Sequence, residues 1–501
     1  MSWWFLFREI FGTPLFHSNP CFLSSIRSSC FQPNDLSLPK IPRMPNTSQA
    51  FTEAVEKKAF DKAHRKKINF NIARYAETVV KGKQQYSDLE LARQKAKNVK
   101  WKAISNLDKY LVEFEANFTA NGGKVIWAQN TEEAIAEILK IVRAKQAKTV
   151  VKSKSMATEE IELNHHLENA GVEVFETDLG EYIQQMDGEK PYHIVTPAMH
   201  KSKEDVADLF HRKLGSPENS TPAELTMIAR KELREKYVTA DIGFSGANFI
   251  IADTGSIAIT ENEGNARLTT SFPKTHIAIV GIEKMIPSIN DLALFWPLLS
   301  TFGTGQNVTV YNTVFSGPKK EEEANGPEEM YVVLLDNDRT NLLAHIDQRE
   351  ALYCIRCGAC LNACPIYKNI GGHSYDTTYS GPIGSVISPH LNGMADYKHL
   401  SFASSLCGNC TEVCPVRIDL HNLLLYNRRD SVKEGLNDTT EKLMMYAWKK
   451  GVLSRNLMNK GTGGMKNSIM KFLFKGSWGK RKTMPHFPAK SFNERWSERY
   501  G

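Results

Sequence analysis

Seven of the nine cysteines lie in two short runs between positions 354 and 414. The first run, "YCIRCGACLNACPIYK" at 353–368, spaces four of them as C-x2-C-x2-C-x3-C-P. This is the spacing of bacterial ferredoxins, in which three close thiolates hold one cubane and the fourth reaches the other cluster of a pair. Zinc sites need only four thiolates and usually group them in twos, so the spacing favours iron and sulfur.

The second run, "LCGNCTEVCPVRI" at 406–418, contains only three cysteines. Aligned on its own Cys-Pro pair, it should place ligands at 404, 407, 410 and 414, but position 404 is a serine. The two runs therefore predict two iron-sulfur clusters of the 4Fe-4S type. The expected ligands are Cys354, Cys357, Cys360 and Cys414 for the first cluster, and Cys364, Cys407 and Cys410 for the second.

One iron of the second cluster lacks a cysteine in this scheme. It could bind Ser404, a histidine such as His373, His390 or His399, an external ligand, or nothing. An unligated corner is easily lost, which would leave a 3Fe-4S centre, and it could instead bind a small molecule directly. The sequence leaves these alternatives open.

The placement of the cysteines also indicates a compartment. A secreted disulfide protein would spread its pairs over the chain, whereas local clustering at short spacing indicates metal ligation under reducing conditions. We therefore expect a cytoplasmic protein. The remaining two cysteines, Cys21 and Cys30, lie in residues 1–43, for which we expect a disordered extension or translation that starts at Met44. A mitochondrial transit peptide is a second interpretation of that segment.

The positive charge is concentrated near the C-terminus. Residues 447–501 carry 13 Lys and Arg against 2 acidic residues, an excess of +11, so the rest of the chain is at −4 and the total is +7. We expect a solvated, partly helical arm, with an anionic membrane surface at the inner membrane face or an acidic partner as alternatives. Nucleic acid is not expected, because no binding motif accompanies the charge. No apolar run reaches the roughly 18 residues needed to cross a membrane.

Hydrophobic periodicity divides the 501 residues into several parts. After the 1–43 extension we expect helices over 44–118, and then an α/β domain over 119–340, in which strands alternate with helices as in a mainly parallel sheet. Within it, 192–197 reads as a strand, and the Gly-rich and Asn-rich turns of 246–287 predict an antiparallel portion, hence a mixed sheet. The 42 residues between Cys364 and Cys407 and their helical flanks predict an α-helical ferredoxin domain over 341–445, followed by the basic tail at 446–501.

Several longer segments carry a family resemblance. They are "GFSGANFIIADTGSIAITENEGNARL", "TFGTGQ", "FSGP", "CIRCGACLNACPIYKNIGGHSY", "LCGNCTEVCPVRIDL" and "FNERWSER". Taken together, they resemble the lactate utilisation protein B family, iron-sulfur proteins of bacterial L-lactate oxidation. The resemblance covers about residues 50–500 and leaves out residues 1–43.

This resemblance implies a fold, partners and ligands. The α/β domain would be a LUD-like domain, similar to the glucosamine-phosphate isomerase, ribose-phosphate isomerase and CoA-transferase group, followed by the α-helical ferredoxin-type domain. The chain would join a cysteine-rich partner subunit and a second LUD-domain subunit in a complex that oxidises L-lactate to pyruvate. The seven matching cysteines would be cluster ligands, and the three-cysteine second run fits the family pattern.

Two functions follow as hypotheses. The first is an electron-transfer subunit, because no flavin or nicotinamide fingerprint would let this chain accept a hydride alone; its electron acceptor is left open. The second is a self-contained enzyme whose α/β domain binds an organic acid or acyl-CoA, with the clusters as relay or sensor. For that role the candidate residues are Glu261, Glu263 and Asn265 in "TENEGNARL".

Overall fold

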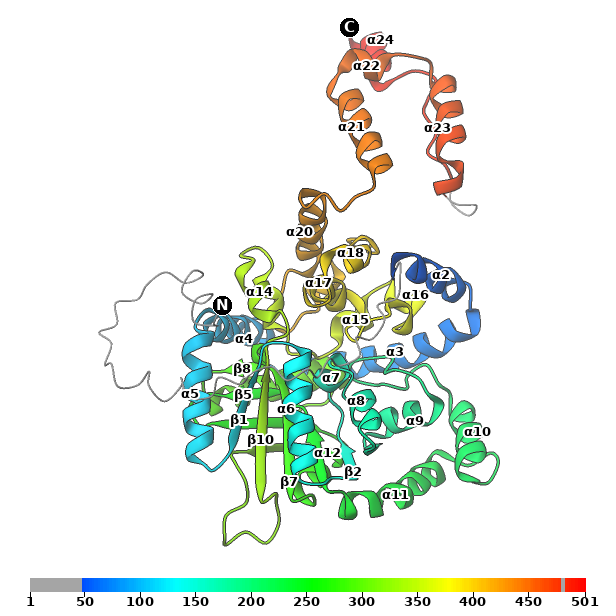
Figure 1. The fold of residues 1–501 in the computed structure, drawn as a ribbon. Coiled ribbons are helices and arrows are strands. Elements are labelled where there is room, and N and C mark those ends of the chain that lie inside the picture. Colours follow the sequence, from blue (N-terminus) through cyan, green and yellow to red (C-terminus); the bar gives the residue numbers. More distant parts are fainter. Residues whose placement is uncertain (1–46, 479–482) are drawn as a thin grey trace, which may run out of the picture. The chain divides into compact units, whose positions relative to one another are not determined.

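The computed structural model describes residues 47–478 and 483–501 (Figure 1). The expected N-terminal extension, with Cys21 and Cys30, lies outside the described residues. Contacts within the chain group the residues up to Asp430 in one compact unit and Ser431–Gly501 in a second. The domain boundaries drawn from the sequence stay predictions, while the order of helical, α/β and cysteine-rich parts can be followed in the structure.

The chain is helical ahead of its first strand, as its periodicity predicts. The elements are α2 (Thr47–Ala59), α3 (Lys62–Gly82), η2 (Lys83–Gln85), α4 (Leu89–Ser105) and α5 (Leu107–Ala120). Two of them begin at aspartate caps: Asp61 accepts the N–H of His64, and Asp88 accepts the N–H of Leu91. The apolar positions recur at three- and four-residue steps, so each helix buries one face, as with Ile68 and Ile72 on α3.

Six strands form a parallel sheet in the order β1-β10-β7-β4-β2-β3. Its strands are β1 (Lys124–Ala128), β2 (Thr149–Lys152), β3 (Glu173–Glu176), β4 (Ile242–Ser245), β7 (Thr275–Gly281) and β10 (Glu329–Leu335). Successive side chains point to opposite faces, so Ile277 and Ile279 of β7 enter one core while Ala278 and Val280 enter the other. The predicted α/β architecture is confirmed.

A second, four-stranded sheet has the order β8-β5-β6-β9. It contains β5 (Phe249–Ile251), β6 (Ser256–Glu261), β8 (Met285–Ile286) and β9 (Tyr311–Phe315). The pairs β5–β6 and β6–β9 are antiparallel, and β5–β8 is parallel. The antiparallel portion expected in 246–287 therefore exists as a sheet of its own, although residues 275–281 of that range belong to the parallel sheet.

Helices along the α/β part pack against the strands or against one another (Figure 1). They are α6 (Thr131–Ala144), α7 (Met156–Glu160), α8 (Leu163–Asn169), α9 (Leu179–Asp187), α10 (Lys203–Leu214), α11 (Pro222–Thr239), α12 (Asn265–Ser271), α13 (Leu292–Thr304) and α14 (Arg339–Ala344). One expectation is wrong: residues 192–197 are not a strand. The His193 ring accepts the N–H groups of Val195 and Thr196, and this local bonding replaces a strand ladder.

The cysteine region is helical, which confirms the predicted ferredoxin-type architecture. Its elements are η5 (Arg349–Tyr353), α15 (Ala359–Ala363), α16 (Tyr367–Ile370), η6 (His373–Tyr375), α17 (Gly381–Leu391), α18 (Met394–Phe402), α19 (Asn409–Glu412) and α20 (Leu420–Lys433). Its buried side chains share one continuous core with α3 to α5 and the four-stranded sheet. The α/β and ferredoxin-type parts are therefore packed against each other without a solvent layer.

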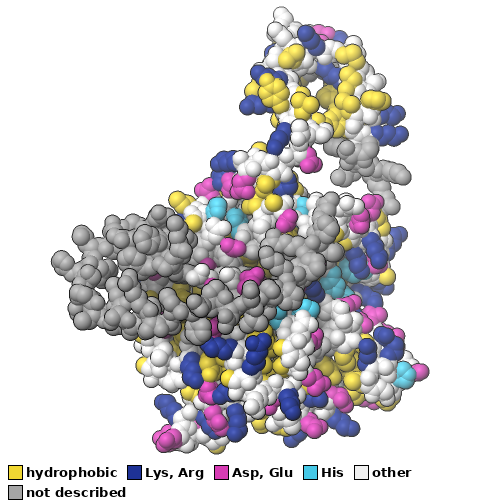
Figure 2. All heavy atoms as spheres, in the orientation of Figure 1, with side chains coloured by type: hydrophobic (Ala, Val, Ile, Leu, Met, Phe, Trp, Pro, Cys, Tyr) yellow, Lys and Arg dark blue, Asp and Glu magenta, His cyan; other side chains and the backbone are white. Residues whose placement is uncertain are grey.

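The unit formed by Ser431–Gly501 contains the basic tail. Its helices are α21 (Thr439–Leu453), α22 (Arg455–Asn459), α23 (Gly463–Trp478) and α24 (Phe492–Tyr500). Large apolar side chains stand among its lysines and arginines (Figure 2), and Phe472 is 87% exposed. Among the described residues, no helix is both long and apolar enough to cross a bilayer.

Candidate iron-sulfur site

The two cysteine runs share one backbone geometry. Arg356 and Gly358, on either side of Cys357, have φ angles of +61° and +77°. Leu406 and Gly408, on either side of Cys407, have φ angles of +52° and +78°. A positive φ is uncommon outside glycine, so its recurrence at matching places marks the runs as structural repeats. Each is followed by a short helix, α15 or α19.

Ser404 takes the place of the first cysteine in this repeat. In the first run, the Cys354 Sγ accepts the N–H of Arg356 at 3.4 Å. In the second run, the Ser404 Oγ accepts the N–H of Leu406 at 3.1 Å. In each run, the backbone N–H two residues further along the chain donates to this side chain, which is a thiol in the first run and a hydroxyl in the second.

The thiols fall into two groups. Burial, and then the neighbouring Cys414 and Cys354, raise the pKa of Cys357 well above its usual range. Burial, followed by Cys354 and Cys357, does the same for Cys360. One small cavity is lined by all four members of this group, Cys354, Cys357, Cys360 and Cys414.

The second group contains the three remaining thiols. Burial raises the pKa of Cys410 to about 11, with contributions from Cys364 and Cys407. Cys407 is exposed, and its pKa is lowered by the backbone N–H of Asn409. These groups match the two ligand sets expected from the spacing, and ligation by each cysteine stays a prediction.

The first group fits an iron-sulfur cluster. Buried thiols with raised pKa values stay protonated at neutral pH unless a metal centre stabilises the thiolates. Backbone N–H groups point at the sulfurs, from Arg356 to Cys354 and from Ile418 to Cys414 at 3.3 Å, as is usual around clusters. Apart from Arg356, the large side chains around this cavity are apolar: Ile194, Ile355, Ile383, Val416, Ile418 and Leu420. Soft sulfur donors in a dry setting suit iron and sulfur.

Helix α4 holds the second run in place. The Arg93 guanidinium donates to the carbonyl oxygen of Cys414, with its Nε at 3.1 Å, and to that of Glu412 at 2.7 Å. The Asn409 amide donates to the carbonyl of Ala363 at 3.0 Å and so ties the runs together. Sequence reasoning missed Arg93, because no local pattern links it to a cysteine 321 residues away.

Two of the three candidate histidines are hydrogen-bonded elsewhere, and the third packs against an aromatic ring. The His373 Nε2 pairs with the carbonyl of Lys190 at 2.7 Å, and the His390 Nε2 pairs with the Asn427 side chain at 2.9 Å. The His399 ring packs against Phe51, with 5.0 Å between ring centroids. Within the part of the chain that the structure describes, none of these contacts is to a cysteine.

A buried ion network joins the sheet to the first cysteine run. The Arg339 guanidinium donates to Glu160 at 2.8 and 2.7 Å and to Glu283. Glu283 also accepts from Arg356 at 3.2 Å, and Glu160 accepts from the Tyr379 hydroxyl at 2.6 Å. Burial alone would raise the pKa of Glu283, but the two guanidinium groups outweigh it and hold that pKa at about 2.

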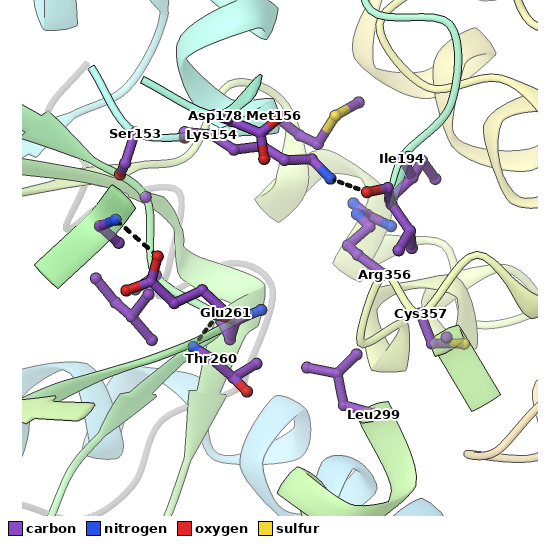
Figure 3. A pocket seen from close by; sticks show the side chains of 18 of the residues that line it. Ser153, Lys154, Met156, Asp178, Ile194, Thr260, Glu261, Leu299, Arg356 and Cys357 are labelled. Carbon is purple, nitrogen blue, oxygen red and sulfur yellow. Dashed lines mark hydrogen bonds between the residues drawn. The ribbon is translucent and has the colours of Figure 1, made fainter. Parts of the chain in front are cut away.

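A cavity of about 380 Å³ lies beside this network (Figure 3). Its walls come from residues that follow parallel strands, such as Lys154 after β2 and Gly246 after β4, and from Arg356 and Cys357. Ligands of open α/β folds bind at this carboxyl edge of the strands. The structure therefore places a ligand-sized cavity directly against one of the predicted cluster cysteines.

The three α/β candidates all line this cavity. The Glu261 carboxylate accepts the N–H groups of Ala266 at 2.7 Å and Arg267 at 2.9 Å, so it caps α12. The Glu263 carboxylate accepts the N–H of Leu179 at 3.1 Å, and burial, with Asp178 nearby, raises its pKa to about 7. Asn265 is buried in the first turn of α12.

Comparisons with known proteins place the chain in a family. Residues 111–335 match the LUD domain, and residues 350–418, which include all seven clustered cysteines, match a 4Fe-4S dicluster domain. Lactate utilization protein B of Geobacillus thermodenitrificans is 50% identical over 74% of this chain and 78% of its own length. The chain belongs to the lactate utilisation protein B family. The protein of that name from Bacillus thuringiensis is 48% identical over 74% of this chain and 78% of its own.

Among solved structures, a DUF162 family protein from Deinococcus radiodurans aligns with 46% of this chain and 98% of its own. Its identity is 13% and its TM-score is 0.27, a score from which no shared fold is inferred. The resemblance drawn from the sequence motifs to the lactate utilisation protein B family is confirmed by the relatives and by the two matched domains.

Proposed function

We propose that this chain is the iron-sulfur electron-transfer subunit of a bacterial complex that oxidises L-lactate to pyruvate. The observation that carries the proposal is the arrangement of the seven thiols in two groups, within a 4Fe-4S dicluster domain of a lactate utilisation protein B. The relatives' name supplies the substrate, and the absence of a flavin or nicotinamide fingerprint in the sequence assigns hydride removal to another subunit.

The residues of this chain would bind, insulate and expose the redox centres. A bound 4Fe-4S cluster supplies one-electron transfer, with a potential set by hydrogen bonds to sulfur and by solvent. Ile355, Ile383 and Val416 exclude water from the first group of thiols. Cys407 lies at the surface, which suits electron exchange with another protein at the second group. Oxidation of lactate to pyruvate releases two electrons and two protons, and two one-electron carriers match that number of electrons.

The partners follow from the same proposal. They are a cysteine-rich subunit and a second LUD-domain subunit of the lactate-oxidising complex, and the complex is cytoplasmic. Contact with the inner membrane face, in this proposal, runs through the basic tail. Helix α23 supports this because exposed Phe472 and Leu473 lie between Lys471 and Lys475, a combination of apolar and basic side chains that binds anionic lipid surfaces.

Iron and acid-labile sulfide per chain, measured on anaerobically purified protein, test the cluster count. We expect about eight irons, with two coupled paramagnetic signals after dithionite reduction. In the reconstituted complex, serine variants of the predicted ligands should abolish lactate oxidation, whereas Glu261→Gln should leave it unchanged. A chain that contains zinc, or complex activity that survives the cysteine changes, would refute the proposal.

The tail is tested by flotation with vesicles. The full chain should bind vesicles rich in phosphatidylserine, less so as salt rises, and should not bind phosphatidylcholine vesicles. Because each lysine near an anionic surface contributes about 1 kcal/mol, replacing Lys466, Lys471 and Lys475 by Gln should weaken binding roughly a hundredfold. Equal binding of the triple variant and the parent would exclude this route to the membrane.

The cavity supports a second candidate function, an enzyme that acts on an organic acid or acyl-CoA. Its volume of about 380 Å³ is that of ligand pockets, which span roughly 300–1,000 Å³. In that case Glu261→Gln or Asn265→Ala should lower turnover by the purified chain itself. Turnover by the isolated chain is therefore the measurement that separates the two candidates.

A further inference from the structure

One wall of the cavity carries donors that the protein does not satisfy. The Arg356 side chain is only 9% exposed. Its Nη2 donates to Glu283 at 3.2 Å, while its Nε and Nη1 have no hydrogen-bond partner among the described residues. The guanidinium stacks over the Tyr379 ring, 4.5 Å from its centre, which fixes its plane. A buried N–H without an acceptor costs free energy, so an acceptor from outside the chain would complete this wall.

The charges on this wall also indicate that an anion from outside the chain binds here. The carboxylates of Glu160 and Glu283 match the guanidinium groups of Arg339 and Arg356. Lys284, the next residue after Glu283, also lines the cavity, and its ammonium makes no hydrogen bond or ion pair with any residue that the structure describes. One positive charge on this wall therefore has no carboxylate of its own.

The acidic side chains of the cavity do not supply that charge. Glu261 accepts backbone N–H groups of α12, and Asp178 accepts those of Gly180 and Glu181 at 3.0 and 3.1 Å. Glu263 likewise accepts the backbone N–H of Leu179 at 3.1 Å. Figure 3 shows Glu261 and Arg356 on opposite sides of the cavity. The cavity thus has a cationic wall beside Cys357 and, facing it, a wall of acidic and uncharged polar side chains, with space between them.

We infer that the cavity is a binding site for a short hydroxy or oxo acid, whose carboxylate lies on Arg356 and Lys284 beside Cys357. A guanidinium is the side chain best suited to a buried carboxylate. The hydroxyl or oxo group faces the opposite wall, which offers the side chain of Asn265. The inference goes beyond electron transfer, because it gives this chain a small-molecule site next to a predicted cluster ligand, whether or not the chain turns that molecule over.

Anaerobic titration calorimetry on the full, iron-loaded chain tests the site, with L-lactate, pyruvate and inorganic phosphate as probes. We expect one site for at least one of the two acids. Arg356→Gln should weaken its Kd at least tenfold, because a charge-assisted hydrogen bond is lost. Lys284→Gln should weaken it severalfold. Lys274→Gln is the matched control, because Lys274 is exposed and lies just before the start of strand β7, whereas Lys284 lies beyond its end. This variant should leave the Kd unchanged.

Iron content is measured for every variant, since Arg356 lies between two predicted ligands. Lys284 is outside the cysteine runs, so Lys284→Gln still tests the site if Arg356→Gln loses iron. Binding of phosphate alone, no binding of either acid to an iron-complete parent, or a Kd that is unchanged in Lys284→Gln would overturn the inference. An iron-poor parent that binds the acid as expected would refute the iron-sulfur proposal and uphold this one.

Discussion

Ser404 holds in the second cysteine run the place that Cys354 holds in the first. Each side chain accepts the backbone N–H two residues ahead, at 3.1 Å for the Ser404 oxygen and 3.4 Å for the Cys354 sulfur. In each run, the two residues that flank the next cysteine have positive φ angles. Because the candidate histidines are hydrogen-bonded or packed elsewhere, we propose that the Ser404 hydroxyl is the fourth ligand of the second cluster.

Substitution of Ser404 tests that ligand directly. The parent should contain about eight irons, and Ser404→Ala about seven, with the signal of an oxidised 3Fe-4S centre, because one corner loses its only protein donor. Ser404→Cys should restore about eight. Iron analysis and paramagnetic resonance before reduction provide both measurements, with Ser87→Ala, at an exposed serine outside the cysteine runs, as the control. Identical iron content in Ser404→Ala and the parent would rule the hydroxyl out.

Loss of a cysteine from the first group should destabilise the fold more than loss of one from the second group. Cys357 is buried in the first group, so Cys357→Ser should remove about half of the iron and lower the unfolding temperature, because the remaining thiolates lose their shared centre. Cys407 is exposed, so Cys407→Ser should lose iron from the second group alone and unfold near the parent temperature. Iron analysis with thermal unfolding followed by circular dichroism measures both. Full iron in Cys357→Ser would contradict the assignment.

Cysteine spacing is a local code, so the sequence predicted the two groups of thiols that the structure brings together, while ligation by each cysteine stays a prediction. The polar loop "TENEGNARL" also indicated Glu261, Glu263 and Asn265, which all line the cavity. It could not find Arg93, Lys284 or the position of Arg356, since their roles depend on packing between segments far apart in the chain.

The strand expected at 192–197 failed for a local reason. The succession of strands and helices along the α/β domain predicted it, but a side-chain acceptor, His193, takes the N–H groups that a strand partner would need. A pattern of strands and helices in the sequence carries no information about competition between a side chain and a strand partner for the same backbone N–H groups. The same segment instead lines the cavity through Ile194 and Val195, so the misassigned stretch belongs to a candidate functional site.

The ion network between the sheet and the first cysteine run should be strongly coupled. Arg339 is 2% exposed and contacts Glu160 and Glu283, so Arg339→Met would leave buried Glu160 without a cation and Glu283 with Arg356 alone. Breaking a buried pair costs about 3–5 kcal/mol. The exposed pair of Lys124 and Glu329 is the matched control, and Lys124→Met should cost less than about 1 kcal/mol. Denaturant midpoints measure both, and equal losses would show that the network contributes little.

His276 should make the fold sensitive to acid. It is fully buried on β7, where its Nε2 pairs with the Ser245 hydroxyl at 2.7 Å, and burial lowers its pKa from 6.5 to about 3. The folded chain therefore keeps the ring neutral between those values, while the unfolded chain protonates it. Since the unfolded state binds the extra proton, stability falls as pH drops below 6.5, by about 1.4 kcal/mol per pH unit, and this loss ends near pH 3.

His276→Gln removes the titration and keeps a side chain that can pair with Ser245. Between pH of about 7.5 and about 5.5, the parent should lose roughly 1–2 kcal/mol more stability than the variant does. Urea midpoints at the two pH values measure this, and His165→Gln, which changes an exposed histidine, should behave as the parent. Other titrating groups are common to all three chains, so the comparison isolates position 276. Parallel pH dependence in the parent and His276→Gln would mean that the ring is protonated in the folded state, or that water reaches it there.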